Sequence, residues 1–193
     1  MFALHSSSVA FDPIGFFFSL VVGLLIGSFL NVIIHRVPKS VLSDDAAVQA
    51  SAFPILSCLV RPPSSTPCCH VGIAWYDNIP LISWLILRGK CRACGAPIHV
   101  RYLLVEISAA ATFALVFLMF GQSWTTVWYC LFFAILIALF WIDLETYLLP
   151  DCLTLTLLWL ALIGAAVGVL PLTADEAIIG AAIAYAGMWS VDG

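Results

Sequence analysis

The first long apolar stretch of the chain reads IGFFFSLVVGLLIGSFLNVII and runs from Ile14 to Ile34. It contains no charged residue, and about 20 mostly apolar residues are enough for a helix to cross the hydrocarbon core of a bilayer. No Lys or Arg precedes it. It is also too long for the apolar region of a secretory signal and has no small-residue cleavage site. We therefore interpret this stretch as a retained transmembrane helix.

Four more stretches of this kind follow a polar segment, and they cover Tyr102–Phe120, Trp124–Ile142, Cys152–Leu170 and Ala177–Val191. Hydrophobic residues make up 63% of the chain and charged residues only 9%, whereas a soluble domain carries about 25% charged residues. We predict an all-α, polytopic transmembrane helical bundle of about five helices. Its parts are a first transmembrane helix in residues 1–35, a loop in 36–101 and a membrane core in 102–193.

The basic residues are confined to one part of the chain. All seven fall in the loop or at its ends: Arg36, Lys39, Arg61, Arg88, Lys90, Arg92 and Arg101. Lys and Arg concentrate in the cytoplasmic loops of membrane proteins. We therefore expect a multi-pass protein with its amino terminus outside and the loop in the cytoplasm. The turn at Asp143–Asp151 then returns to the cytoplasmic side, and the connections at 121–123 and 171–176 lie outside.

Four of the seven cysteines gather in the second half of this loop, in a segment too short to be stabilised by a hydrophobic core: Cys68, Cys69, Cys91 and Cys94. Because the cytoplasm is reducing, cysteines there bind metal more often than they form disulfides. The Cys91–Cys94 spacing directs two thiolates to one ion. A second pair about 20 residues upstream is typical of a zinc ribbon.

The upstream pair is irregular, because Cys68 and Cys69 are adjacent. Thr66 stands where a cysteine would complete a second two-residue knuckle with Cys69, and a threonine supplies no thiolate. One interpretation is a small zinc-ribbon-like module held by Cys69, Cys91 and Cys94, with Cys68 or His70 as the fourth ligand. The alternative is a degenerate site that holds metal weakly or not at all.

Polar residues within the apolar stretches are the next candidates, since ionisable groups in a membrane are costly and mark functional sites. Asp143 closes the stretch Trp124–Ile142, and a carboxylate at a helix carboxyl end opposes the helix dipole, which favours the neutral acid. It is a candidate for proton transfer, or an interfacial acid that only ends a helix. Glu106 is a second candidate, or pairs with Arg101 or Arg36. Asp151 follows Pro150 and suits an N-cap.

Small residues recur in the first helix. Gly23, Gly27 and Asn31 are spaced four apart, so they share one face. Glycines at such positions let two helices approach closely, and an Asn hydrogen-bonds across the contact. We expect this face to pack on another helix.

These features together resemble the prepilin leader peptidases, the membrane aspartyl proteases of type IV pilus and type II secretion systems. Five ordered motifs between about Ile14 and Val191 carry the resemblance. They are Gly27–Val32 with His35–Pro38, Trp75–Leu81, Arg88–Cys94, Arg101–Glu106, and Ile142–Leu144 with Leu148–Asp151.

The resemblance implies an enzyme of the bacterial inner membrane that cleaves the leader peptides of prepilins or pseudopilins at the cytoplasmic membrane face. Many family members also methylate the new amino terminus with S-adenosylmethionine. By motif position Asp143 corresponds to the first catalytic aspartate, and the cysteine module to a zinc-binding feature. The expected partners are these substrates and the lipid bilayer, with no nucleic acid.

The family's second aspartate lies in a Gly-x-Gly-Asp motif, and this sequence reaches Gly193 before such a motif. We therefore expect the peptidase core in 102–193 to be incomplete at its carboxyl end. Asp192 is a minor candidate for the missing second carboxyl. The alternative to a peptidase is a catalytically inactive remnant that binds prepilins or secretion and pilus subunits without cleaving them. Cleavage of a prepilin distinguishes the two hypotheses.

Overall fold

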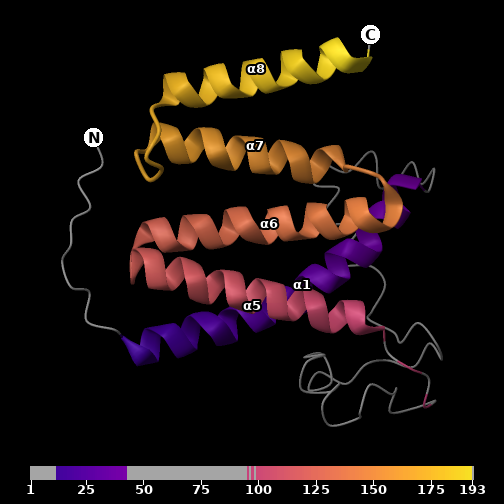
Figure 1. The fold of residues 1–193 in the computed structure, drawn as a ribbon, viewed down its shortest axis with the longest axis vertical. Helices are drawn as coiled ribbons and strands as arrows, with labels where there is room; N and C mark the ends of the chain where they lie inside the picture. Colours follow the sequence, from indigo (N-terminus) through magenta and orange to yellow (C-terminus); the bar gives the residue numbers. More distant parts are fainter. Residues whose placement is uncertain (1–11, 43–94, 96, 98, 193) are drawn as a thin grey trace.

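The computed structural model describes residues 12–42, 95, 97 and 99–192, and Figure 1 shows its five helices. The predicted all-α bundle is confirmed in this part of the chain. The helices are α1 (Pro13–Leu42), α5 (Val100–Phe120), α6 (Trp124–Thr146), α7 (Asp151–Ala166) and α8 (Ala174–Asp192). The predicted loop of residues 36–101 lies mostly outside the described residues; at its ends, α1 continues to Leu42 and α5 begins at Val100.

Four of the helices lie side by side in the order α5, α6, α7, α8, and α1 crosses α5 and α6 obliquely (Figure 1). The main core forms where α1, α5 and α6 meet. Its most buried members include Ile34 and Val37 of α1, Val105 and Ala109 of α5, and Ala138 and Ile142 of α6. The two outer helices are more exposed, and α8 packs mainly on α7.

The face that carries Gly23, Gly27 and Asn31 packs on α5, as the sequence predicted. A Cβ atom at Gly23 would lie 2.7 Å from the Ala110 Cα, and one at Gly27 would lie 2.7 Å from the Glu106 Cα. Neither backbone neighbour is able to move away as a flexible side chain does. Asn31 is buried at the same contact, where its Nδ2 donates a hydrogen bond of 3.0 Å to the Tyr102 carbonyl.

The helix ends follow local sequence signals. The Asp12 carboxylate accepts a hydrogen bond of 3.1 Å from the Ile14 amide, and Pro13 occupies the first helical position, where its missing N–H costs nothing. Ser123 caps α6 by accepting from the Thr126 amide at 3.2 Å. At α8, Thr173 and Glu176 form a reciprocal capping box. The hydrogen bond from the Thr173 amide holds the pKa of the Glu176 carboxyl below its usual value.

Asp151 does not act as the N-cap that the sequence analysis proposed. The helix α7 begins at Asp151 itself, and the capping position belongs to Pro150, with no side-chain hydrogen bond. The Pro150 carbonyl instead accepts hydrogen bonds from the amides of Leu153 and Thr154. Asp151 therefore stabilises the helix through its charge in the first turn, close to the positive end of the helix dipole.

Three described helices are long and apolar enough to cross a membrane, in the segments Pro13–Ser40, Val100–Phe120 and Trp124–Thr146. Large apolar side chains on their outer surfaces are exposed, for example Phe17, Leu118 and Phe140. Such a surface is stable in lipid and not in water. The protein is therefore an integral membrane protein.

The fourth apolar helix is shorter than expected. The sequence predicted Cys152–Leu170, but α7 ends at Ala166 and has 16 residues. The chain turns there because Gly168 takes a left-handed φ of 71°, and the amides of Val169 and Leu170 donate to the Gly164 carbonyl. The membrane crossings expected for Cys152–Leu170 and Ala177–Val191 stay predictions.

The α1–α5 contact yields a test with a matched control. We expect Gly23→Ala to lower the free energy of unfolding by roughly 1–3 kcal/mol, because the added methyl group overpacks a backbone contact. A Cβ atom at Gly180 in α8 would meet nothing within 4 Å. Gly180→Ala should therefore leave stability unchanged or raise it by about 0.5–1 kcal/mol. Equilibrium unfolding of both variants in detergent measures the difference. Equal stability of the two variants would refute the close contact.

Candidate active site

Asp143 lies in the last turn of α6, one turn before the chain leaves the helix. The sequence analysis placed it at the helix end, but α6 continues to Thr146. The Asp143 carbonyl accepts a hydrogen bond of 2.9 Å from the Tyr147 amide, and Tyr147 closes the helix in the left-handed conformation with φ 53°. A tyrosine is unusual there, because its Cβ atom makes this conformation costly. The turn after Asp143 is therefore a defined cap.

The Asp143 side chain is exposed and borders an open groove of about 510 Å³. The groove lies along α6, and its remaining lining is apolar except for one α5 serine: Ser108, Leu136, Ile137, Leu139, Phe140, Trp141 and Leu149. The arrangement places an exposed carboxyl group at the border of an apolar surface.

The first turn of α5 contacts the last turn of α6 close to Asp143. The Arg101 guanidinium forms a salt bridge with both carboxylate oxygens of Glu145. The same guanidinium lies 4.7 Å from the centre of the Tyr102 ring, within cation–π range. The sequence analysis did not single out Glu145. The sequence shows that Glu145 lies two residues after Asp143. It does not show the salt-bridge partner, because Arg101 is 44 residues away along the chain.

Glu106 is fully buried in the α1–α5 contact, where its backbone and Cγ lie against Gly27. The sequence analysis left open whether it is a functional acid or an interfacial partner of Arg101 or Arg36. The salt bridge recorded for Arg101 is the one with Glu145. Glu106 therefore lies in the α1–α5 contact, and whether it acts as a functional acid or pairs with a basic residue stays a prediction.

Asp192, the remote candidate for a second carboxyl, is the last residue of α8. The carboxyl ends of α6 and α8 lie at the same end of the bundle, but α7 lies between the two helices (Figure 1). The backbone arrangement therefore does not bring Asp192 beside Asp143.

The predicted zinc ligands Cys68, Cys69, Cys91 and Cys94 lie outside the described residues, and so does His70. Within the described part of the chain, no three or more His, Cys, Asp or Glu side chains are arranged to hold a metal. Gly95, which directly follows the Cys91–Cys94 pair, has a left-handed φ of 69°. A glycine suits this position, because a side chain there would be strained.

Two family models match consecutive parts of the chain. The model of the bacterial peptidase A24 N-terminal domain matches residues 21–120, and that of the type IV leader peptidase family matches residues 130–192. The chain belongs to the type IV leader peptidase family. The first match includes the Gly23, Gly27 and Asn31 face and Arg101, and the second includes Asp143 and Glu145.

Several curated relatives of this leader peptidase family member are named prepilin leader peptidase/N-methyltransferase. The protein of Stutzerimonas stutzeri is 42% identical over 95% of this chain and 66% of its own length. The protein of Pseudomonas aeruginosa is 39% identical over 95% of this chain and 66% of its own length. That of Neisseria gonorrhoeae is 40% identical over 88% of this chain and 62% of its own length. The chain thus spans slightly less than two thirds of these relatives. No solved structure matches it.

Proposed function

We propose that this protein is a prepilin leader peptidase, an aspartic-type endopeptidase that removes leader peptides from prepilins or pseudopilins of pilus or secretion systems. The observation that carries the proposal is Asp143. It is an exposed carboxyl beside an apolar groove, near the end of a helix long and apolar enough to cross a membrane, within the segment that matches the family. The names of the relatives support the same substrate class.

The chemistry assigns a defined task to this carboxylate. Peptide hydrolysis by an aspartic protease needs one ionised carboxylate, which takes a proton from the attacking water, and one protonated carboxyl, which polarises the scissile carbonyl. Two carboxyls held close together share one proton, because they cannot both ionise readily. We propose Asp143 as one member of such a pair. The resemblance assigns the other to a Gly-x-Gly-Asp motif.

Replacement of Asp143 tests the proposal. We expect Asp143→Asn to lower leader cleavage by at least about 100-fold, because the amide accepts no proton from water. The assay measures cleavage of a prepilin in detergent, with the 193-residue chain and with a chimera that continues into a family Gly-x-Gly-Asp segment. Asp175→Asn, the same change in the exposed first turn of α8, is the control and should retain activity.

Two results would contradict the peptidase proposal. One is full activity of Asp143→Asn, and the other is absence of cleavage by a folded chimera. Prepilin binding by a chimera that does not cleave would favour the alternative hypothesis of a membrane protein that only binds these subunits.

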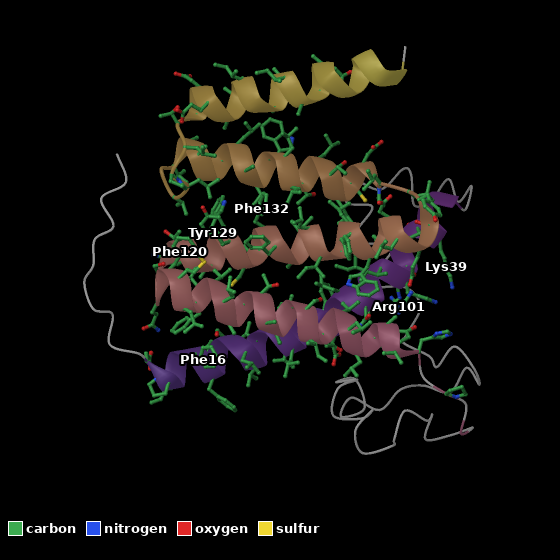
Figure 2. The ribbon with its side chains drawn as sticks, in the orientation of Figure 1. Phe16, Lys39, Arg101, Phe120, Tyr129 and Phe132 are labelled. Atoms are coloured by element: carbon green, nitrogen blue, oxygen red, sulfur yellow. The ribbon has the colours of Figure 1, made fainter. Side chains whose placement is uncertain are left out.

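We further propose that the protein lies in the bacterial inner membrane with its amino terminus outside and the loop of residues 36–101 in the cytoplasm. Lys39 and Arg101 lie at one end of the bundle, and Phe120 and Tyr129 at the other (Figure 2). The Phe120 and Tyr129 rings stack with their centres 4.8 Å apart. Cytoplasmic ends of membrane proteins are rich in Lys and Arg, and aromatic residues accumulate at membrane interfaces.

Labelling of spheroplasts tests this orientation. The native cysteines lie in the proposed cytoplasmic loop or within apolar helices, so an impermeant maleimide should not label the wild-type protein. Gln122→Cys, in the exposed turn between α5 and α6, should react. Labelling of the wild-type protein from outside, or of Gln122→Cys only after permeabilisation, would reverse the orientation.

For the cysteine module we propose one structural zinc ion, held by Cys69, Cys91 and Cys94 with Cys68 or His70 as fourth ligand. The support is the spacing of these residues and the left-handed Gly95 beside them. We propose N-methylation as a second activity, with S-adenosylmethionine as donor, because the relatives' name includes it. Transfer of a labelled methyl group to the new amino terminus tests that activity.

Metal analysis of the purified protein tests the zinc site. We expect about one zinc ion per chain, and loss of the metal in Cys91→Ser because a hydroxyl replaces a thiolate ligand. Cys152→Ser is the control, since Cys152 lies in α7 packed against the core, and it should retain the metal. A zinc content near zero in the wild-type protein would show that Thr66 has broken the site.

A further inference from the structure

The turn of α6 that carries Asp143 has little support of its own. Ile142 is fully buried, but the three residues after it are exposed, and the Tyr147 side chain is 89% exposed. Helix ends with few buried contacts open locally, and Tyr147 adds the cost of a left-handed conformation. A catalytic carboxyl at this place therefore needs another contact to hold its turn.

The Arg101–Glu145 salt bridge supplies that contact. The Arg101 guanidinium contacts both oxygens of Glu145, two residues after Asp143. Both contacts come from the same Nη1 atom, and the charges on the two partners strengthen the interaction, so it holds the two side chains close together. The two side chains are 19% and 34% exposed, so the pair is partly shielded from water.

Arg101 is itself held by the rest of the bundle. Its guanidinium lies over the Tyr102 ring, and the Tyr102 carbonyl accepts the hydrogen bond from the buried Asn31 of α1. A series of contacts, from Asn31 through Tyr102 and Arg101 to Glu145, thus connects the packed helices α1 and α5 to the last turn of α6.

We propose that Arg101 and Glu145 are positioning residues, which hold the last turn of α6 so that the Asp143 carboxylate keeps one fixed place beside its groove. The expected effect on the cleavage rate rests on the proposed function, whereas the expected effect on local opening of the turn does not. Neither side chain acts on the substrate. Their role is to prevent movement of the Asp143 turn, because a displacement of about 1 Å in a catalytic group is enough to lower a rate 100-fold.

Hydrogen exchange of the purified 193-residue protein tests the structural part. We expect Arg101→Gln to speed exchange of the Asp143–Tyr147 amides by at least about fivefold, while the middle of α6 stays protected. The double variant Arg101→Glu with Glu145→Arg should restore most of the protection. Lys39→Gln is the matched control: it removes a cation at the same end of the bundle, but its recorded contact is with His35 on its own helix. This control should exchange like the wild type.

Cleavage kinetics test the expected effect on catalysis. They are measured with the 193-residue chain or the chimera, whichever cleaves a prepilin. We expect Arg101→Gln and Glu145→Gln each to lower kcat roughly 10- to 100-fold with little change in KM, and the charge swap to recover part of kcat. Exchange in Arg101→Gln equal to that of the wild type overturns the inference, and so does faster exchange with unchanged kcat. If no form cleaves, the proposed function fails, and hydrogen exchange alone decides whether the pair holds the turn.

Discussion

The close approach of α1 to α5 is the contact on which the remaining structure depends. At Gly23 and Gly27 the two helix backbones come so near that a single methyl group would meet backbone atoms at 2.7 Å. Helices in lipid gain little from the hydrophobic effect when they associate, so dispersion contacts between small residues and a few buried hydrogen bonds decide which faces pair. The Asn31 amide provides one such bond. This contact places the first turn of α5, and through it Arg101, at a fixed position in the bundle.

The proposed chemistry uses what this framework holds in place. Asp143 lies near the end of α6 with an exposed side chain, and an apolar groove lies beside it along the same helix. The salt bridge from Arg101 to Glu145 holds the turn that carries the carboxylate. Packing between the helices thus fixes the position of the proposed catalytic carboxyl.

Much of this arrangement was predictable from the sequence, because helices in lipid need long apolar stretches and because glycine and asparagine four residues apart share one face. The five helices and the α1 contact face followed from these two rules. Local end effects were less predictable. The sequence placed Asp143 at the helix end and Asp151 at a capping position, whereas backbone hydrogen bonds to Asp143 and Pro150 set both ends.

Tertiary contacts were the least predictable part. Nothing local indicates that Arg101 meets Glu145, since their meeting depends on how α5 and α6 pack. The exposure of Asp143 likewise depends on the groove that neighbouring side chains leave open. The predicted zinc module and its four cysteines lie outside the described residues, so that prediction still rests on the cysteine spacing and on the left-handed Gly95 beside it.

The most direct measurement of the role of Asp143 is carboxyl footprinting of the folded protein with a carbodiimide and an amine, read by mass spectrometry. An uncleavable prepilin peptide that includes the leader junction should protect Asp143 from modification. It should leave Asp175, at the start of α8, as reactive as before. Protection of both residues, or of neither at saturating peptide, would contradict the assignment of Asp143 to the substrate site.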